Sequence, residues 1–599
     1  MEREYRTLDG LWRFQPDPLQ EGSGRRYPRE DYDDSRWPEA QVPNVFERCL
    51  QGMDFYRHIG WFRRRFTVPG SWQGQRTILR FEGANYRTRV WVNGLDVGGN
   101  DDGFLRFDLP IERALHSAGS NVVAVRVDNR ERIEDVPGLH RGWRPFGGIL
   151  RSVGLIATNP LHLEAVQVSG TPGHGDGTIE LKALACNGRQ VEVRSRLTVE
   201  LFPRGEAPVA SWTLPELRLA SGEIAPIVWK ATVKGIRPWS PATPNLYLLR
   251  LTLQMGDVEL DTAEERFGFR SICTNGTQLL LNGEPIRLKG FNRHEDSAER
   301  DQAVDTQTAQ RDLETMKSTG ANFVRLCHYP HDPSTLDLCD ELGLLAMEEI
   351  PLYWWTGYEE GEVVYDQRLE AAKRQLRALV ARDFNHPAVV FWSVSNENRD
   401  DHPEVREGNA TLIRLVKSLD CSRLVMHVAD RWHTSPAFCE DDIICCNWYP
   451  TWAPMSWGRG ETLYDLDDGA ALWQRELTRL HDRFPDRPIL ISEFGYPCLA
   501  GVSGGAAGED AQAEAIAKEY AAIRDLPFVC GATVWCWADH AWPLPGYFPD
   551  SNPCYLRTIT VSPFGVVTRD RRHKTALSVL KGLWQNQIDR ELAKGDARQ

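Results

Sequence analysis

Polar and aromatic residues gather at the points where a series of apolar, strand-like runs in this sequence ends. A single residue of this kind carries little meaning, because a polar side chain at a strand end is often a structural cap. A purely structural set of strands does not need so many, so the pattern indicates a binding or catalytic site. The residues are Asn292, Arg293, His294, Glu295, Cys327, His328, Tyr329, Glu348, Glu349, Asn396, Glu397, Asn447, Tyr449, Glu493, Trp535 and Trp537.

Two glutamates of this set could act as a catalytic pair. Glu397 ends the fourth apolar run and Glu493 the seventh. Two carboxyl groups that flank a glycosidic bond can hydrolyse it, with one of them protonating the leaving group. A separation of about 5–5.5 Å between them gives retention of anomeric configuration, and about 6.5–9.5 Å gives inversion. The residues alone leave this choice open.

Eight apolar runs provide the strands that must hold these residues. They are PIRLKGFNRH, NFVRLCHYP, LLAMEEIP, AVVFWSVSNEN, LVMHVAD, IICCNWYP, PILISEFG and ATVWCWAD. Helical patterns alternate with them: Ala309, Leu313 and Met316 share one helical face, and Gly320 is suited to end that helix. The alternation predicts a (β/α)8 TIM barrel over residues 273–599, with its site at the carboxyl ends of the strands. A doubly wound open sheet is the alternative, weakened because no glycine-rich phosphate loop follows the first strand.

The first 272 residues have the alternating pattern of β-strands. Asn93-Gly94 lies between two such runs and predicts a tight hairpin. Residues 1–160 are predicted to form one all-β domain, because Asn159-Pro160 marks a plausible boundary. Residues 161–272 are predicted to form a β-sandwich of immunoglobulin type, without the inter-sheet cysteine pair of antibody domains.

Composition excludes several kinds of partner. The 599 residues carry a formal net charge of −14, whereas nucleic-acid binding needs a basic surface. No stretch reaches the about 18 apolar residues of a membrane span, and the N-terminal residues lack the apolar region of a secretory signal. The 13 cysteines include no C-x-x-C pair, and no Cys/His cluster has the spacing of zinc ligands. We therefore expect a cytoplasmic protein with reduced thiols and no metal or other cofactor.

Longer motifs make the chain similar to glycoside hydrolase family 2, which contains β-galactosidases, β-glucuronidases and β-mannosidases. LDGLWRF, RVWVNG and GGILRSV resemble the N-terminal sugar-binding jelly roll of that family. GFNRHED, GANFVRLCHYPHDP, LCDELGLL, HPAVVFWSVSNEN and ISEFG resemble its barrel signatures. The layout, together with TRDRRHK at residues 568–574, is most similar to the short, three-domain β-glucuronidases.

The resemblance implies a role for each matching residue. Glu397 resembles the general acid/base and Glu493 the nucleophile of a retaining mechanism. Asn396 is expected to bond the sugar 2-hydroxyl, and Tyr449 resembles the tyrosine that steadies the nucleophile. The full set of implied substrate-binding residues is Asn396, His294, His328, Asn447, Tyr449, Trp535 and Arg557.

The sequence differs from the family pattern at a metal-binding position and at a position in the jelly roll. Large β-galactosidases bind a metal through a glutamate and a histidine after the third barrel strand, and here Tyr353 and Trp355 stand at those places. No catalytic metal is therefore predicted. Family members often supply an aspartate from the jelly roll, at a position that matches Gly142, beside Trp143 and Arg144.

A third departure concerns the far end of the sugar. The β-glucuronidases hold the sugar carboxylate with an Asn-x-Lys motif, and here the matching stretch is Ser562-Pro563-Phe564. Arg557 does match a nearby arginine of those enzymes, so an acidic sugar stays possible. The stretch from Ala541 to Pro553 is longer than the family pattern and could reshape the sugar pocket.

The leading prediction is a retaining exo-β-glycosidase that removes terminal β-linked sugars. A galactoside or other neutral β-hexoside is slightly favoured over a β-hexuronide, because Arg557 alone would have to replace an arginine, a lysine and an asparagine. An inactive carbohydrate-binding homologue is the alternative from another class, and the presence of both glutamates speaks against it. The 21 tryptophans could stack on sugars or fill large cores. A carbohydrate partner and a homo-oligomer, dimer or tetramer, are expected from the resemblance.

Overall fold

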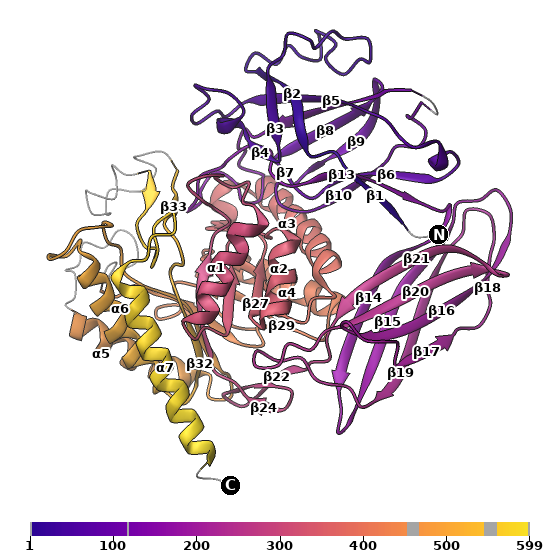
Figure 1. The fold of residues 1–599 in the computed structure, drawn as a ribbon. Helices are drawn as coiled ribbons and strands as arrows, with labels where there is room; N and C mark the ends of the chain where they lie inside the picture. The colour runs from indigo at the N-terminus through magenta and orange to yellow at the C-terminus, as the bar shows by residue number, and fades with distance from the viewer. Residues whose placement is uncertain (1–2, 117–118, 452–465, 544–559, 597–599) are drawn as a thin grey trace.

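Three architectures follow one another along the chain (Figure 1). The computed structural model describes residues 3–116, 119–451, 466–543 and 560–596. A β jelly roll comes first, an immunoglobulin-like sandwich second, and a closed (β/α)8 barrel last. The fold class predicted from the sequence is confirmed.

The jelly roll packs two antiparallel sheets, β1-β13-β6-β10 and β3-β2-β5-β11-β8-β9, against each other, with a small sheet β4-β12-β7 beside them. The predicted hairpin joins β8 to β9, and both turn residues, Asn93 and Gly94, have the positive φ of a type I′ turn. The strands are β1 (Glu4–Thr7), β2 (Gly10–Asp17), β3 (Glu39–Val42), β4 (Asn44–Val45), β5 (Ile59–Phe66), β6 (Arg76–Phe81), β7 (Ala84–Asn85), β8 (Arg87–Val92), β9 (Leu95–Asp101), β10 (Phe107–Pro110), β11 (Asn121–Asp128), β12 (Gly148–Ile149) and β13 (Val153–Thr158).

The sandwich pairs the sheet β14-β15-β19 with the sheet β17-β16-β20-β21, and β18 pairs with β16. Alternate residues of β16 from Val193 to Leu201 are buried between the sheets, as a period of two requires. The strands are β14 (Leu161–Pro172), β15 (Asp176–Asn187), β16 (Val193–Pro203), β17 (Ala210–Thr213), β18 (Leu217–Leu219), β19 (Ile224–Lys234), β20 (Tyr247–Met255) and β21 (Val258–Phe267). A small sheet of β22 (Ile272–Asn275), β23 (Gln278–Leu281) and β24 (Glu284–Pro285) leads into the barrel.

Eight parallel strands close the barrel in chain order, and each corresponds to one predicted apolar run. Their side chains form one large buried core with those of the surrounding helices. The strands are β25 (Leu288–Arg293), β26 (Phe323–Leu326), β27 (Leu345–Glu349), β28 (Val389–Asn396), β29 (Leu424–Ala429), β30 (Ile444–Asn447), β31 (Ile489–Phe494) and β32 (Val529–Val534). A two-stranded sheet of β33 (His540–Ala541) and β34 (Val561–Ser562) follows the last of them.

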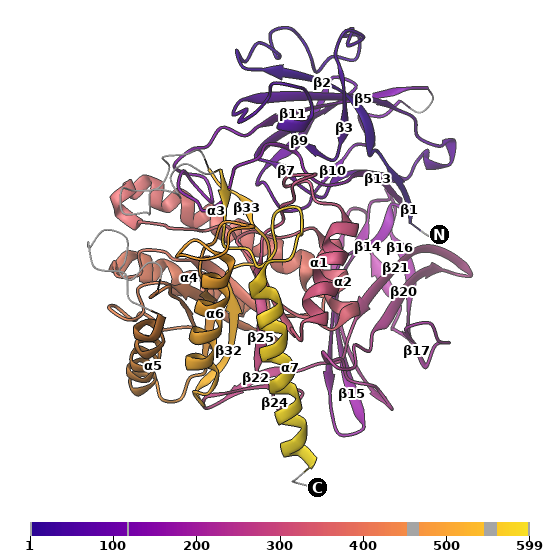
Figure 2. The same ribbon diagram turned by 60° about the vertical axis from the view of Figure 1, so that its left-hand side comes forward.

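The barrel helices cover the outside of the strands (Figure 2). In α1, Ala309, Leu313 and Met316 are buried against the barrel, and Gly320 follows the helix with a φ of 96°, as predicted. None of the helices among the described residues is long and apolar enough to cross a membrane. The helices are α1 (Thr306–Ser318), α2 (Pro333–Leu342), α3 (Glu362–Asp383), α4 (Pro403–Leu419), α5 (Leu466–Arg483), α6 (Glu509–Arg524) and α7 (Thr575–Asp596).

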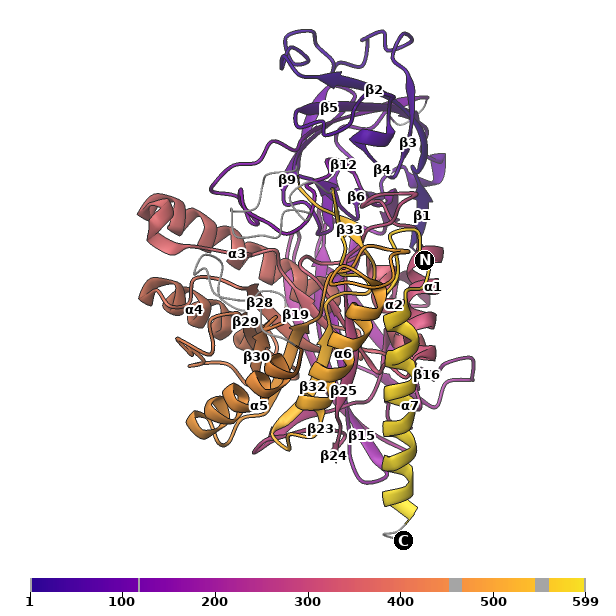
Figure 3. The ribbon, with the colours of Figure 1, turned by 90° about the vertical axis from the view of Figure 1, so that its left-hand side faces the viewer.

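The jelly roll sits over one end of the barrel, close to β33 (Figure 3). Arg151 fixes this arrangement: its NH2 atom donates to Glu295 Oε2 at 2.7 Å and to the carbonyl oxygen of Pro330 at 2.6 Å. The backbone amide of Arg144 also donates to the carbonyl oxygen of Ala541 at 2.9 Å. Residues at the carboxyl ends of β25, β26 and β32 are therefore covered by a segment of the N-terminal domain.

Candidate active site

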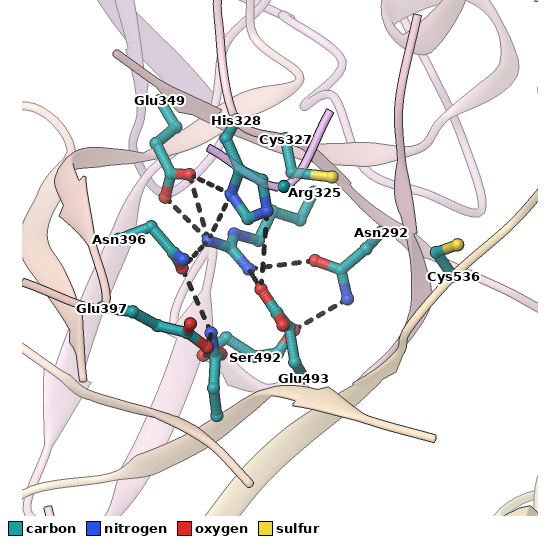
Figure 4. A network of polar contacts seen from close by, with 12 residues as sticks. Asn292, Arg325, Cys327, His328, Glu349, Asn396, Glu397, Ser492, Glu493 and Cys536 are labelled. Carbon is teal, nitrogen blue, oxygen red and sulfur yellow. Dashed lines mark hydrogen bonds and ion pairs between the residues drawn. The ribbon is translucent and has the colours of Figure 1, made fainter. Parts of the chain in front are cut away.

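Glu397 and Glu493 lie at the carboxyl ends of β28 and β31, the fourth and seventh strands of the barrel (Figure 4). Both side chains are buried. A chain of hydrogen bonds joins them through the side chains of Asn447, Asn396 and Arg325. The barrel therefore brings together two residues that are far apart in the sequence, as predicted.

Neutral donors hold the Glu397 carboxyl group. Trp354 Nε1 donates to Oε2 at 2.8 Å, and Asn447 Nδ2 donates to Oε1 at 2.8 Å. Glu397 has a φ of 51°, in the left-handed region that non-glycine residues rarely adopt, and its amide bonds the carbonyl oxygen of Val428 at 2.9 Å. Strained backbone of this kind is held by its surroundings and tends to occur at functional sites.

Glu493 has a cation and a hydroxyl as its donors. Arg325 NH1 donates to Oε1 at 2.6 Å, and the Tyr449 hydroxyl donates to Oε2 at 2.5 Å. Burial, with a smaller contribution from Glu397, raises the pKa of Glu493 to about 8, and Arg325 and Tyr449 offset this rise only in part. Among the described residues, the one cation bonded to either carboxyl group thus contacts Glu493, which distinguishes the surroundings of the two glutamates.

Arg325 is the centre of the site and is fully buried. Besides Glu493, its guanidinium donates to Glu349 at 2.9 and 3.0 Å, to Asn396 Oδ1 at 2.6 Å and to Asn292 Oδ1 at 3.1 Å. The pKa of Arg325 is raised by the two glutamates despite its burial, so it stays charged. A buried cation with this many partners fixes the positions of all four side chains.

Glu349 is the permanent counter-charge of Arg325. Burial opposes its charge, but Arg325, the His328 ring and the Ser393 hydroxyl lower the pKa of Glu349 to about 2. The Ser393 hydroxyl donates to it at 2.6 Å, and His328 Nδ1 lies 2.8 Å from its Oε1 atom. Burial lowers the pKa of His328 to about 4, so this ring is neutral near pH 7.

Asn396 and His294 each have a buried nitrogen atom with no hydrogen-bond partner among the described residues. Asn396 uses its oxygen to accept from Arg325 and Asn447, which leaves Nδ2 free. His294 has its Nδ1 atom 3.2 Å from the Tyr329 hydroxyl, which leaves Nε2 free. Leaving a buried polar group unpaired costs about 1–3 kcal/mol, so these atoms are suited to contact a polar ligand.

Aromatic rings form one side of the site. The centroid of the Trp535 ring lies 5.2 Å from that of His328 in a stacked geometry and 5.4 Å from that of His294 in an edge geometry. Trp143 reaches in from the jelly roll, with its ring 5.8 Å from His328 and 5.3 Å from Tyr353. The Trp143 Nε1 atom is also buried and unpaired among the described residues.

Gly142 occupies the position where family members often have an aspartate, and the structure limits what can stand there. A Cβ atom added to Gly142 would lie 3.0 Å from the Tyr353 hydroxyl oxygen. The carbonyl oxygen of Gly142 instead faces His540 Nε2 at 3.3 Å. The Tyr353 hydroxyl therefore leaves little room for a side chain at position 142.

Only some of the residues predicted to lie near the C5–C6 end of the sugar are among the described residues. Phe564 is buried, and its ring centroid lies 5.9 Å from that of Tyr449 in an edge geometry. Ser562 is buried with its hydroxyl oxygen unpaired among the described residues. Arg557, with most of the stretch from Ala541 to Pro553, lies outside the described residues. The remaining predicted residues are all brought together: Glu397, Glu493, Asn396, His294, His328, Asn447, Tyr449 and Trp535.

Sequence reasoning missed the centre of this network. Arg325 carries a charge inside the buried strand β26, and that departure from an apolar run was the available signal. Trp354 could not have been found, because its contact with Glu397 depends on a backbone φ of 49° in the loop after β27. Among the described residues, the ligand atoms of His294, Cys327 and His328 lie within 4.8 Å of one another, a grouping that the spacing along the chain does not show.

Three family models cover nearly the whole chain. The models match residues 25–159 (glycosyl hydrolases family 2, sugar binding domain), 161–270 (glycosyl hydrolases family 2) and 272–588 (glycosyl hydrolases family 2, TIM barrel domain). The chain belongs to glycoside hydrolase family 2. It is therefore a glycoside hydrolase, and the family together with the paired carboxyl groups supports a retaining exo-glycosidase.

Relatives within family 2 differ in how much of the chain they match. A β-glucuronidase of Paenibacillus borealis is 28% identical over 98% of this chain and 97% of its own length. A β-galactosidase of Thermoanaerobacter pseudethanolicus is also 28% identical, over 70% of this chain and 55% of its own length. The solved structure of a β-glucuronidase from an uncultured Clostridium shares the fold, with a TM-score of 0.85, 24% identity and coverage of 98% of both chains.

Proposed function

We propose that this family 2 enzyme is a retaining exo-β-glucuronidase, which hydrolyses terminal β-linked hexuronic acids by double displacement. The observation that carries the proposed reaction is the pair of buried glutamates, one bonded by Arg325 and one by neutral donors. The glucuronide is supported by the full-length relatives, which are named β-glucuronidases. The comparisons thus favour the uronide over the neutral sugar that the sequence slightly favoured.

In this mechanism Glu493 attacks the anomeric carbon while Glu397 donates a proton to the leaving oxygen. Glu397 then loses its proton as Glu493 becomes an uncharged ester, so the buried site keeps the same net charge. In the second step Glu397 takes a proton from water, the water oxygen attacks the anomeric carbon, and the bond from this carbon to Glu493 breaks to release its carboxylate. Arg325 and Glu349 stay paired throughout. Glu397 and Glu493 are therefore never both negatively charged at the same step of the proposed reaction.

The remaining side chains are proposed to bind the sugar. Asn396 Nδ2, which is unpaired among the described residues, is proposed to donate to the 2-hydroxyl, and His294 and His328 are proposed to contact the sugar through their Nε2 atoms. Asn447 orients Glu397 and Asn396 together, since its Nδ2 atom bonds both. Trp535 offers a flat ring for the sugar's C–H face.

Tyr449→Phe is expected to move the acid limb of the pH profile upward. The tyrosine hydroxyl bonds the ionised form of Glu493 and so lowers its pKa. Without it the pKa rises, protonation begins at higher pH, and activity at low pH is lost earlier. The lost charged hydrogen bond, about 1.5–3 kcal/mol, corresponds to a roughly 10–150-fold fall in kcat/KM. Profiles of kcat/KM against pH test this, and an unmoved acid limb would contradict the contact's role. Tyr365→Phe removes a hydroxyl that bonds the Glu404 carbonyl oxygen instead, and serves as the control.

Exhaustive dialysis against EDTA is expected to leave kcat/KM unchanged. The two carboxyl groups suffice for the chemistry, and Tyr353 and Trp355 offer no good metal ligands where the large β-galactosidases bind theirs. Assays before and after dialysis, with and without added magnesium, test this. A loss of activity that magnesium restores would show that a metal does take part.

A panel of nitrophenyl glycosides tests the glycone. The β-glucuronide is expected to have the highest kcat/KM, with the β-galacturonide next and neutral hexosides lower. Arg557→Ala should reduce turnover of the uronides far more than that of the β-galactoside, because a carboxylate without its cation costs about 1.5–3 kcal/mol. Equal losses on both kinds of substrate would count against a selective role for Arg557.

A neutral β-hexoside remains the second candidate, and one feature of the site favours it. Phe564 stands where β-glucuronidases have the carboxylate-binding lysine, and it belongs to an apolar cluster with Trp535, Cys536 and Trp542. Such a surface suits an uncharged C6 group better than a carboxylate. A β-galactoside turned over faster than every uronide in the panel would establish this candidate.

A further inference from the structure

Two imidazole rings and one thiol lie close together beside the proposed sugar-binding residues. His294 follows β25, and Cys327 and His328 follow the adjacent strand β26. One nitrogen of each ring and the Cys327 Sγ atom lie within 4.8 Å of one another, and all three residues are buried. Figure 4 shows the Cys327 and His328 side chains beside Arg325. Imidazole and thiolate are the ligands that zinc prefers in proteins.

The two rings are already oriented as metal-binding histidines are. A ligating histidine usually has its other ring nitrogen bonded to a carboxylate or another polar group, which fixes the ring. His328 Nδ1 lies 2.8 Å from Glu349 Oε1, and His294 Nδ1 lies 3.2 Å from the Tyr329 hydroxyl. The Nε2 atoms are therefore the ones available to a metal, and that of His294 has no hydrogen-bond partner among the described residues.

We infer that His294, Cys327 and His328 form a Zn²⁺ site whose occupation inhibits the enzyme. The site overlaps the proposed sugar-binding residues, and His328 Nε2 lies only 3.9 Å from the Oε1 atom of the proposed nucleophile Glu493. A metal held there would exclude the sugar and neutralise the attacking carboxylate. Inhibition should therefore be competitive with substrate.

Geometry and charge both allow a cation here. Zinc–nitrogen and zinc–sulfur bonds of about 2.0–2.3 Å place tetrahedral ligand atoms about 3.3–3.8 Å apart, so the three atoms must approach one another by up to about 1.5 Å. Arg325 is paired with Glu349 and Glu493, so carboxyl groups beside the site offset its positive charge. On binding, the Cys327 thiol loses its proton to solvent and its sulfur forms the bond to zinc.

This metal is an inhibitor and takes no part in the proposed reaction, so EDTA should leave catalysis intact. The site rests on residues at the base of the pocket, whichever sugar the pocket takes. Its failure and that of the proposed glucuronidase activity are separable, because the first is measured with metal and the second with a substrate panel.

Zinc titrations of initial rates test the inference, each protein being compared with its own rate in chelator. In the parent enzyme, Zn²⁺ is expected to raise the apparent KM without changing kcat. Cys327→Ser should raise the inhibition constant at least about tenfold. Loss of a residue that only hydrogen-bonds a metal ligand already weakens metal binding by about that factor, and Cys327 is proposed to bind the metal directly. Cys498→Ser is the matched control, because Cys498 is a buried thiol bonded to Gln512 outside the cluster. Equal inhibition of Cys327→Ser and parent would overturn the site, as would a parent enzyme that zinc does not inhibit.

Cobalt binding gives a readout that does not depend on activity. Co²⁺ added to the parent enzyme should produce a thiolate-to-cobalt charge-transfer band, which is lost in Cys327→Ser and kept in Cys498→Ser. If Cys327→Ser does not fold, the parent enzyme alone decides: free monosaccharide product at saturating concentration should displace the cobalt and abolish the band. A band that the monosaccharide leaves unchanged places the metal elsewhere and overturns the inference.

Discussion

Replacing Glu493 with alanine is expected to lower kcat by roughly 10⁴–10⁶-fold on every substrate, as expected for the loss of a residue that takes part directly in the reaction. The proposed glycosyl-enzyme cannot form, so a good leaving group should not restore the rate. Sodium azide should enter the space left by the carboxylate and attack the anomeric carbon directly. The product is then an α-glycosyl azide, identified by NMR.

A matched control separates loss of a nucleophile from loss of a buried carboxyl group. Burial raises the pKa of Glu519 to about 8, and its Oε1 atom accepts from Thr451 at 2.6 Å, away from the site. Glu519→Gln alters a buried carboxyl group outside the site and should keep nearly full activity. A β-azide from Glu493→Ala, or a rate that recovers on activated substrates, would contradict the role proposed for Glu493.

Replacing Glu397 with alanine is expected to give a loss that depends on the leaving group. A nitrophenolate leaves without a proton, so glycosylation should survive on nitrophenyl glycosides and fall about 10²–10⁴-fold on alkyl glycosides. Deglycosylation then limits the reaction, because no base activates water. Azide should relieve it by attacking the covalent intermediate, and the product is a β-glycosyl azide.

The two variants therefore give azides of opposite configuration, and the parent enzyme provides the reference. NMR of the first sugar released by the parent should show the β-anomer. An α-anomer formed first would mean inversion, and Glu493 would then not be the nucleophile. Equal losses on alkyl and nitrophenyl glycosides in Glu397→Ala would count against its role as proton donor.

Periodicity was enough to predict the barrel. Each of the eight apolar runs became a strand in the predicted order, because buried parallel strands are apolar on both faces and stand out from amphipathic helices. The order of the strands in turn placed Glu397 and Glu493 on opposite sides of the barrel mouth. Those two positions follow from counting strands, which requires no knowledge of loop conformation.

Contacts between side chains were beyond such reasoning. Arg325 was overlooked because one charged residue within an apolar run has no periodicity to mark it, although it bonds Glu493, Glu349 and Asn396. Trp354 and Trp143 enter the site from loops, whose paths are set by tertiary packing. The two proposals for the sugar preference rest on Phe564 and on Arg557, and residue types alone did not indicate which of them decides.

The contact between the jelly roll and the end of the barrel bears on how the enzyme is made. Gly142 and His540, which meet at 3.3 Å, are separated by 398 positions in the chain. The ribosome therefore completes the N-terminal domain, including Gly142, long before it adds His540. Trp143 can pack against His328 and Tyr353 only after the first three strands of the barrel have been synthesised. Because the proposed nucleophile Glu493 and His540 both come late in the sequence, we expect hydrolysis to begin only when translation of the whole polypeptide is nearly complete.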